Sequence, residues 1–325
     1  MVESAARRYI SVHDNLRFVM FGRLAFAVLG TAGLTAAAPA PAPAPASVVR
    51  SSVGFVQGSI EGTGPYWFLV DSGANRSALD DDVALKLGLI VPGTSTVEGT
   101  AGTIAVRQAR IKRLRAGALE VRNLKPTVSD LSGSLAPAGQ AIAGILGFDA
   151  LQDQAVLFDM AGGRIAFAVN AARLAPLAGA TIVPFELDNG IPRVAARIEG
   201  VPAKLRIDTG AAIGDGPRTF VNITRPFYER LLAADPKLTP YTEFTASGTG
   251  GEMKIAVVNA NKFTIGGVEV AGPRLLVQPP VGYFARGDAV GFVGSYAFKS
   301  WPGFILDYPR RRLILLGPRA ATRAD

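Results

Sequence analysis

The chain has 325 residues, of which 49% are hydrophobic and 18% charged, a composition that supports a folded body with a sizeable core and excludes disorder and collagen. It contains no cysteine, and its single histidine, His13, lies in an N-terminal stretch that we expect to be outside the folded body. These absences exclude disulfides, thiolate nucleophiles, Cys-ligated zinc, Ser/His/Asp triads and HExxH metal sites. Carboxylates, Lys and Tyr remain for acid–base chemistry.

The net charge of +8 raises the question of nucleic acid or an anionic membrane as a partner. The basic residues form only short clusters, such as those at 112–115 and 310–312, without a long basic arm or interleaved stacking aromatics. Solvated surface residues of a soluble protein explain this pattern better, so we expect no nucleic-acid partner.

Residues 1–38 are predicted to be a signal peptide or an N-terminal anchor. Residues 24–38 form an apolar run of signal-peptide length, preceded by Arg17 and Arg23 and followed by small residues. The run is short for a bilayer span. We expect an exported protein, periplasmic or secreted, with no stable membrane insertion unless an uncleaved segment at 20–38 anchors it.

A Pro/Ala linker follows at 39–47 and contains the run PAPAPAPA, which cannot pack a core and favours an extended tether. The folded body is predicted to begin near Val48. We expect an N-terminal lobe at 48–175, a C-terminal lobe at 176–318 and a tail at 319–325.

The body is predicted to be all-β, because short runs rich in Val, Ile and Phe alternate with Gly, Pro, Asn and Asp. Apolar residues at helical spacing predict short helices at 81–89 and 225–233.

The two halves of the body repeat each other. Each half has an apolar strand ending in D-[ST]-G-A, a short helix, a glycine-rich segment, an apolar-apolar-Gly triplet and a later aspartate before a basic turn. In the first half these landmarks are Asp71-Ser72-Gly73-Ala74, Gly99-Thr100-Ala101-Gly102, Ile145-Leu146-Gly147 and Asp159. In the second half they are Asp208-Thr209-Gly210-Ala211, Ser247-Gly248-Thr249-Gly250-Gly251, Phe292-Val293-Gly294 and Asp307. One D-[ST]-G match alone would be read as a β-turn, whereas two in matched order are strong evidence of a common origin for the halves.

In these landmarks the sequence resembles the aspartic proteases of the retropepsin-like and pepsin-like group, over roughly residues 50–318. The resemblance implies two similar acid-protease β-barrel lobes related by a pseudo-twofold axis, each donating one catalytic aspartate, here Asp71 and Asp208. It implies an aspartic endopeptidase that activates a water between these carboxylates and binds a peptide or protein in a groove between the lobes. We expect a monomer that needs no cofactor and no metal.

The active-site turns also contain residues with supporting roles. Ser72 and Thr209 resemble the hydroxyl residues that brace one lobe's turn against the other in this family. Gly73 and Gly210 fit a role in which a backbone N–H approaches the carboxylates closely and no Cβ intervenes. Flap or substrate-binding residues would be Gly99, Thr100, Ala101, Gly102, Ser247, Gly248, Thr249, Gly250 and Gly251.

Some features depart from the family pattern or have a simpler explanation. Residues 212–219 lengthen the connection after the second turn, which either distorts that turn or carries a specificity loop. Neither glycine-rich segment contains the Tyr typical of pepsin-type flaps. Asp159 and Asp307 precede basic turns, and turn chemistry accounts for them.

Two alternatives to an enzyme stay open: an inactive peptide- or protein-binding module of the same fold, and a binder of anionic surfaces or nucleic acid. Retention of both Asp-[Ser/Thr]-Gly triplets favours the enzyme, because a binder gains nothing from two buried carboxylates that repel each other. An acidic pH optimum is expected, since the pair must keep one proton.

Overall fold

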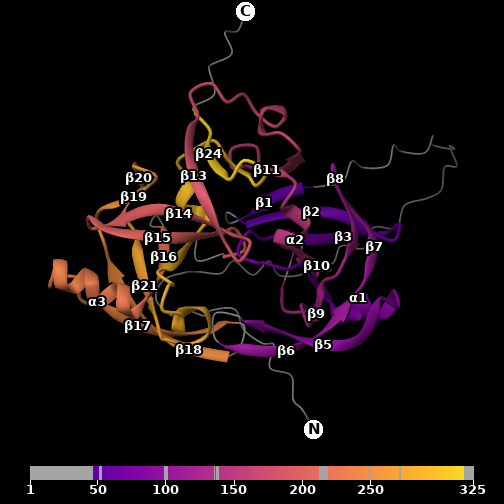
Figure 1. Cartoon of the computed structure of the whole chain (residues 1–325), viewed down its shortest axis with the longest axis horizontal. Coiled ribbons are helices and arrows are strands. Elements are labelled where there is room, and N and C mark those ends of the chain that lie inside the picture. The colour runs from indigo at the N-terminus through magenta and orange to yellow at the C-terminus, as the bar shows by residue number, and fades with distance from the viewer. Residues whose placement is uncertain are drawn as a thin grey trace, which may run out of the picture.

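The computed structural model describes residues 47–50, 53–98, 102–134, 136, 139–211, 219–248, 251–270 and 272–317 (Figure 1). Outside these residues lie the predicted signal peptide or anchor, most of the predicted linker, most of residues 212–219 and the tail. Five of the predicted flap residues also lie outside them: Gly99, Thr100, Ala101, Thr249 and Gly250. Within the described ranges, no helix has the length and apolar character needed to cross a membrane.

The protein is all-β with a few short helices, as expected. The strands up to residue 146 are β1 (Ser47–Arg50), β2 (Val53–Ile60), β3 (Thr63–Val70), β4 (Ala78–Asp80), β5 (Ile90–Glu98), β6 (Thr103–Ala109), β7 (Ile111–Ala116), β8 (Leu119–Leu124), β9 (Thr127–Ser129) and β10 (Gly144–Leu146). The later strands are β11 (Ala155–Asp159), β12 (Arg164–Ala168), β13 (Thr181–Asp188), β14 (Ile191–Ile198), β15 (Val201–Asp208), β16 (Phe220–Thr224), β17 (Thr242–Gly248), β18 (Gly251–Asn259), β19 (Phe263–Ile265), β20 (Val268–Val270), β21 (Arg274–Gln278), β22 (Gly291–Gly294), β23 (Phe304–Asp307) and β24 (Arg312–Leu315). The helices are α1 (Asp81–Lys86), α2 (Phe148–Leu151) and α3 (Arg225–Ala234), with short 3₁₀ turns η2 (Ala171–Arg173), η3 (Gly282–Ala285) and η4 (Ser295–Phe298).

Both predicted helices form, and a capping side chain explains where each one begins. The Asp80 side chain accepts a hydrogen bond from the Val83 N–H and starts α1, and Thr224 caps α3 in the same way through the Phe227 N–H. Helix α1 ends three residues earlier than predicted, because Gly88 adopts a φ of +63°, which continues the chain out of the helix.

The two halves share one strand order, so the internal repeat in the sequence corresponds to a repeat in the structure. The first sheet runs β5-β6-β9-β4-β10-β3-β2-β7-β8, and the second half runs β17-β18-β21-β16-β22-β15-β14, with β19 and β20 beyond β14. In each half the strand that ends near the D-[ST]-G turn, β3 or β15, lies parallel to the triplet strand, β10 or β22. The lobes are therefore two copies of one topology related by a pseudo-twofold axis.

A further sheet, in the order β12-β11-β23-β24-β13, takes strands from both halves and joins them. Strand β1 lies beside β12, where the Val49 N–H donates to the Gly163 carbonyl at 2.9 Å. The equivalent contact in the second half is the Phe185 N–H donating to the Arg311 carbonyl, also at 2.9 Å. The lobe boundary predicted at 175/176 falls in the connection between η2, which contacts β11, and β13, a strand of this shared sheet.

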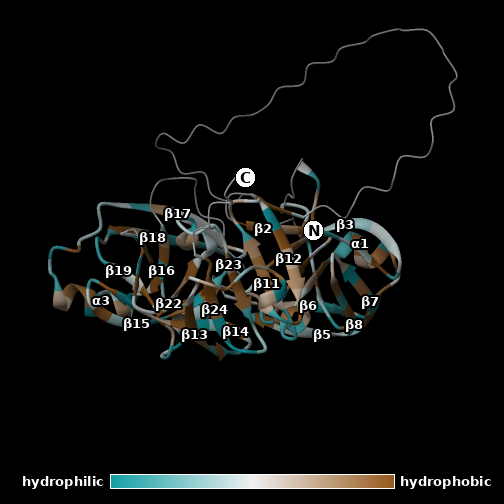
Figure 2. Ribbon diagram, turned by 90° about the horizontal axis from the view of Figure 1, so that it is seen from above, coloured by the Kyte–Doolittle hydropathy of each residue, from teal (hydrophilic) through white to brown (hydrophobic). Residues whose placement is uncertain are grey.

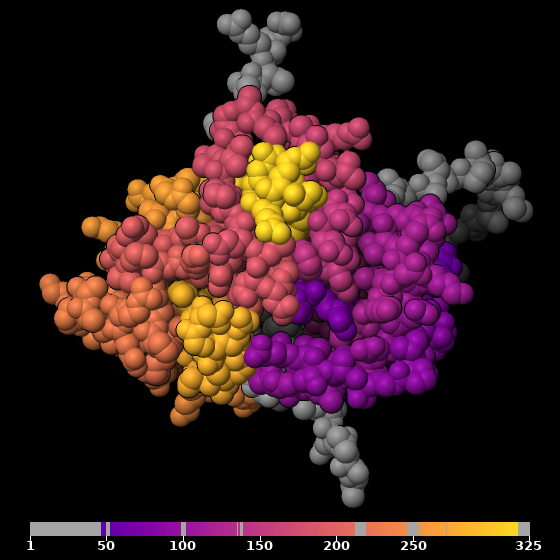
Figure 3. Space-filling view, in the orientation of Figure 1, coloured from indigo at the N-terminus to yellow at the C-terminus, as the bar shows by residue number. Residues whose placement is uncertain are grey.

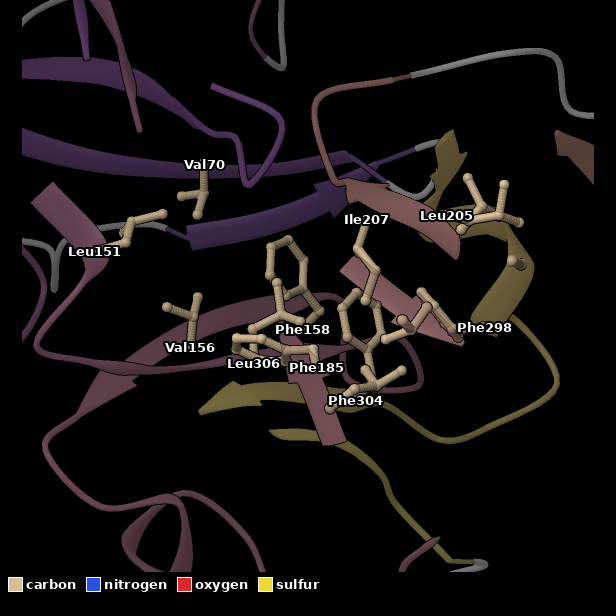
Figure 4. Packing of buried hydrophobic residues seen from close by; sticks show 14 of the residues in the cluster. Val70, Leu151, Val156, Phe158, Phe185, Leu205, Ile207, Phe298, Phe304 and Leu306 are labelled. Atoms are coloured by element: carbon tan, nitrogen blue, oxygen red, sulfur yellow. The ribbon is translucent and has the colours of Figure 1, made fainter. Parts of the chain in front are cut away.

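The hydrophobic core extends across this junction. Figure 2 shows hydrophobic strands in the interior and hydrophilic segments at the periphery. Val70 and Ile207, each 0% exposed, contact one core that also contains Phe158 and Phe304, whose rings stack with centroids 4.7 Å apart (Figure 4). Because Val70 and Ile207 each precede a D-[ST]-G turn, packing of one core fixes where both turns lie.

The first strand begins one residue earlier than predicted, at Ser47, inside the predicted linker. Ser47 pairs with Val56 of β2, and its Oγ accepts a hydrogen bond from the Ile165 N–H at 3.2 Å. This start lies next to the expected beginning of the folded body near Val48, and both contacts of Ser47 are with segments distant in the sequence.

Candidate active site

Asp71 and Asp208 end equivalent strands, and the structure brings their carboxyl groups together. Asp71 directly follows β3, and Asp208 is the last residue of β15. Their side chains are hydrogen-bonded to each other. The Gly210 N–H lies between them, 3.1 Å from Asp208 Oδ1 and 3.2 Å from Asp71 Oδ1. The two carboxyl groups thus form one site at the interface between the lobes.

The glycines of the two turns allow this close approach. The Gly73 N–H donates to Asp71 Oδ1 at 2.7 Å, and the Ala211 N–H donates to Asp208 Oδ1 at 2.9 Å. A Cβ added at Gly73 would lie 2.4 Å from Asp208 Cγ, and one at Gly210 would lie 2.5 Å from Asp71 Cγ. Each turn therefore needs a glycine because the carboxyl group of the opposite lobe occupies the space of a side chain.

Ser72 and Thr209, both fully buried, join the turns by reciprocal hydrogen bonds. The Ser72 N–H donates to Thr209 Oγ1 at 2.9 Å, and the Thr209 N–H donates to Ser72 Oγ at 3.1 Å. Each hydroxyl then donates to a carbonyl of the other lobe, Ser72 to Ile207 at 2.7 Å and Thr209 to Val70 at 2.9 Å. Four buried hydrogen bonds hold the two aspartates in register.

Removal of one hydroxyl is expected to destabilise the protein without changing the shape of the core. Thr209→Val removes the hydroxyl that pairs with the Ser72 N–H and the Val70 carbonyl, which costs roughly 2–6 kcal/mol at about 1–3 kcal/mol for each group. Denaturant unfolding measures the loss, with Thr181→Val on the exposed edge of β13 as the matched control. A Thr209→Val protein as stable as the control would show that the hydrogen bonds between the turns contribute little.

The two aspartates differ in how strongly they hold a proton. Burial and the neighbouring charge of Asp71 raise the pKa of Asp208 well above its ordinary value. Burial also raises the pKa of Asp71, but hydrogen bonds from Gly73, Asp208 and Gly210 oppose the shift. Two raised pKa values at this contact mean that the pair shares one proton, and its titration belongs to both groups together.

This pair makes the stability of the protein depend on pH in a predictable direction. A carboxyl group with a raised pKa in the folded state stabilises the fold fully below its unfolded pKa of about 3.9, and this contribution is lost as pH rises through the folded pKa. Asp208→Asn removes this titration. We expect the melting temperature of Asp208→Asn minus that of the wild type to increase between about pH 4 and 7, in scans at several pH values. A difference that stays constant with pH would contradict a raised pKa.

The apolar-apolar-Gly triplets support the turns from the adjoining strands. The Asp71 N–H donates to the Leu146 carbonyl of β10 at 3.0 Å, and Asp208 pairs with Gly294 in the parallel register of β15 and β22. A Cβ at Gly294 would lie 2.7 Å from the Ala211 carbonyl oxygen. The glycine thus lets the triplet strand pass directly against the turn.

The predicted flap segments lie at the ends of two equivalent hairpins. Strand β5 pairs with β6 up to Glu98 and Thr103, and β17 pairs with β18 up to Gly248 and Gly251. Both hairpins run along the side of the molecule opposite the shared sheet (Figure 1). Figure 3 shows a hollow near the centre of the face turned to the viewer, with pink atoms above it, amber atoms beside it and the purple atoms of the β5–β6 region below. Among the described residues, neither hairpin end forms a hydrogen bond with Asp71 or Asp208.

The later aspartates have structural roles, as expected from turn chemistry. Asp159 accepts hydrogen bonds from the Gly162 N–H at 2.7 Å and from Arg164 Nε at 2.9 Å. Asp307, 0% exposed, binds Arg312 Nη2 at 2.8 Å. Both carboxylates hold the tight turns that close the shared sheet.

A second acidic group, Asp80, Asp81 and Asp130, has carboxylate oxygens within 4.8 Å of one another. Both oxygens of Asp80 already accept backbone hydrogen bonds, one from Val83 at 3.3 Å and one from Leu131 at 3.1 Å. Capping of α1 and of the loop after β9 accounts for this group without a bound ion.

Sequence analysis missed the charged residues next to Asp208. Arg206, 8% exposed, lies two residues before Asp208 on β15 and donates to Asp188 at the end of β13, with 2.8 Å between Nε and Oδ2. The available signal was an arginine between the apolar residues Leu205 and Ile207, where the first half has Leu69.

Comparison with known proteins agrees with the chemistry of the first turn. No curated protein sequence matches the chain. A family model described as aspartyl protease matches residues 56–150, the segment from β2 to α2 that contains Asp71 and the first triplet. Together with the paired carboxyl groups, this match supports placing the protein with the aspartyl proteases.

Proposed function

We propose that the protein is an aspartic endopeptidase of the retropepsin-like and pepsin-like kind, with Asp71 and Asp208 as its catalytic residues. The observation that carries this proposal is the close approach of two carboxyl groups from equivalent turns, both within hydrogen-bond distance of the Gly210 N–H. Two carboxyl groups in different protonation states provide the base and the acid that amide hydrolysis requires, without a metal or a nucleophilic side chain.

The stronger upward shift of the pKa of Asp208 favours Asp208 as the acid and Asp71 as the base. Ionised Asp71 accepts a proton from a water molecule whose oxygen attacks the peptide carbonyl carbon, while protonated Asp208 gives its proton to the carbonyl oxygen. The carbon–nitrogen bond of the tetrahedral intermediate then breaks as the nitrogen takes the proton from Asp71 and the hydroxyl returns its proton to Asp208. The products are a carboxylic acid and an amine, and both aspartates regain their starting states.

The substrate would be a peptide or an extended segment of a protein, bound in the groove between the lobes. The hairpins β5–β6 and β17–β18 would close over it and supply main-chain hydrogen bonds. Both catalytic turns come from one chain, so a monomer suffices for activity. Residues 1–38 would direct export to the periplasm or the exterior, or anchor the protein, and N-terminal sequencing of the mature product tests this part.

Cleavage of a diverse peptide mixture by the full chain, followed by mass spectrometry between about pH 3 and 7, tests the proposed activity. We expect products with the wild type that diminish as pH rises, and none with Asp208→Asn at equal concentration. If both proteins cleave nothing but bind peptides, the protein is a binding module of the same fold. Equal product patterns from both would point to a contaminating protease and would remove the support for the proposal.

A further inference from the structure

The strands that lead to the paired aspartates, β3 and β15, have different side chains at equivalent positions. Each strand, together with its neighbour β2 or β14, forms one wall beside the pair. Leu69 and Arg206 each lie two residues before an aspartate of the pair, and therefore on the same face of the strand as that aspartate. Their cross-strand partners are Phe55 and Arg193. One wall thus has a half-buried apolar pair, and the other has a pair of arginines on the same scaffold.

The arginines of the second wall converge on one carboxylate, Asp188. Arg206 Nε lies 2.8 Å from Asp188 Oδ2, Arg286 Nη2 lies 3.3 Å from Oδ1, and Arg193 Nη1 lies 3.8 Å from Oδ2. Burial acts against the charge of Asp188, but hydrogen bonding to Arg206 and the charges of the three arginines outweigh it and hold its pKa below the ordinary value. The arginines therefore favour the ionised form of Asp188.

An aromatic ring fixes the orientation of the guanidinium groups. Arg206 Cζ lies 4.0 Å from the ring centroid of Tyr283 on η3, and Arg286 Cζ lies 5.8 Å from the same centroid. Tyr283 is buried, and its hydroxyl donates to the Gly291 carbonyl at 3.3 Å. Stacking on a fixed ring places the arginines before any ligand arrives, which lowers the entropy cost of binding.

The cluster retains an excess of positive charge. Arg286 also contacts Asp288 at 3.0 Å, so three guanidinium groups face two carboxylates and the net charge is +1. Arg193 Nε is buried and lacks a hydrogen-bond partner among the described residues. Glu186 binds both Arg193 Nη2 at 3.2 Å and Lys204 at 2.8 Å, so with these two residues included the cluster has four cations, three carboxylates and the same net charge of +1. A further carboxylate would use the unmatched charge and donor.

The cluster lies close enough to the paired aspartates to contact a substrate near the reacting bond. Residues two apart on a strand are separated by about 7 Å, and an extended peptide advances about 3.3 Å per residue. Arg206 therefore lies within about two peptide residues of Asp208 along the groove. In Figure 3 the hollow is bordered by the pink strands around β14 and β15 and by the amber segment that contains η3.

We propose that the wall formed by Arg193, Arg206 and Arg286 selects peptides with an acidic side chain within two residues of the cleaved bond, on the Asp208 side. On the Asp71 side, Phe55 and Leu69 select an apolar side chain. This inference rests on the proposed peptidase function and names the substrate class of the same site.

Matched peptides test the selection. A peptide cleaved by the wild type is remade with Glu, Gln or Lys at each position within two residues of the bond. At one position on one side, we expect kcat/KM for Glu to exceed that for Gln by about tenfold or more, since a charge-assisted hydrogen bond contributes about 1.5–3 kcal/mol. The preference should disappear below about pH 4, where the glutamate side chain of the peptide becomes neutral, and should weaken with added salt.

Single substitutions assign this preference to the cluster. Arg286→Gln, at the partly exposed rim, is expected to reduce the Glu-over-Gln ratio of kcat/KM about tenfold. Arg286→Glu should favour the Lys peptide. Arg197→Gln on the exposed end of β14 removes the same charge outside the cluster and should leave every ratio unchanged. Arg206→Gln serves as a buried test if it remains folded.

The preference for an acidic side chain and the peptidase activity are refuted by different results. Equal cleavage of the Glu, Gln and Lys peptides at every position would overturn the selection and leave the peptidase intact. If nothing is cleaved, binding of the same fluorescent peptides to the wild type still tests the wall. If the Glu peptide binds more tightly and Arg286→Gln removes this difference, the arginine wall selects acidic peptides even without cleavage. Equal binding of all three peptides would refute this selection.

Discussion

Replacement of either Asp71 or Asp208 by Asn is expected to lower kcat/KM by at least about 10³-fold, at the upper end of what one acid–base group contributes. Asn has nearly the same shape, so the hydrogen bonds from Gly73, Gly210 and Ala211 keep an acceptor. What is lost is the base at Asp71 or the proton donor at Asp208, and neither aspartate can perform both roles at once.

The stability of the two variants separates chemistry from folding. Because a buried pair of carboxylates disfavours the folded state at neutral pH, the Asn variants should melt at the wild-type temperature or above it. Asp153→Asn, on an exposed turn, is the matched control and should keep full activity. A single variant at the paired positions that retains near-wild-type kcat/KM with the same products would remove the two-carboxylate account.

Gly210→Ala is expected to reduce kcat/KM by at least about 100-fold, since displacement of a catalytic group by about 1 Å has effects of this size. The new methyl carbon would lie 2.5 Å from Asp71 Cγ, so either the carboxyl groups separate or the turn shifts. The Gly210 N–H, which lies within hydrogen-bond distance of both carboxyl groups, would move with it. Gly73→Ala, whose methyl would meet Asp208, should behave in the same way.

Gly287→Ala provides the control for these alanine substitutions. No heavy atom lies within 4 Å of a Cβ added there, and its φ is not in the region that favours glycine. It should change neither kcat/KM nor melting temperature measurably. If Gly210→Ala were also silent, the close approach of the second turn to Asp71 would not be needed for activity.

The paired turns were accessible from the sequence because their signal is local and occurs twice. An apolar strand, an aspartate, a hydroxyl residue and a glycine are contiguous in each half, and the repeat places Asp71 and Asp208 in equivalent positions without any knowledge of contacts. The caps at Asp80 and Thr224 likewise adjoin the helices that they start. Local chemistry at these positions agrees with the tertiary structure.

The shared sheet and the arginine wall could not be derived in this way, because their contacts are between distant segments. Pairing of β11 with β23 joins residues that are about 150 positions apart, and no periodicity within either strand encodes the partner. Asp188, Arg206 and Arg286 belong to three separate elements, and Arg206 alone reads as a surface charge. Only the register of β14 and β15 and the packing of η3 show that it is buried beside the site.

The measurement that tests the central claim most directly is a ¹³C NMR titration of the side-chain carboxyl groups in the wild type, in Asp71→Asn and in Asp208→Asn. If Asp71 and Asp208 share one proton, the wild type should show a carboxyl signal that remains protonated well above the ordinary pKa of about 3.9, in a titration with two coupled steps. Asp208→Asn should reduce this titration to the single step of Asp71. In Asp71→Asn the remaining Asp208 should titrate at lower pH, because the neighbouring charge is gone. Two carboxyl groups that titrate independently near about pH 4 in the wild type would contradict the shared proton and with it the proposed mechanism.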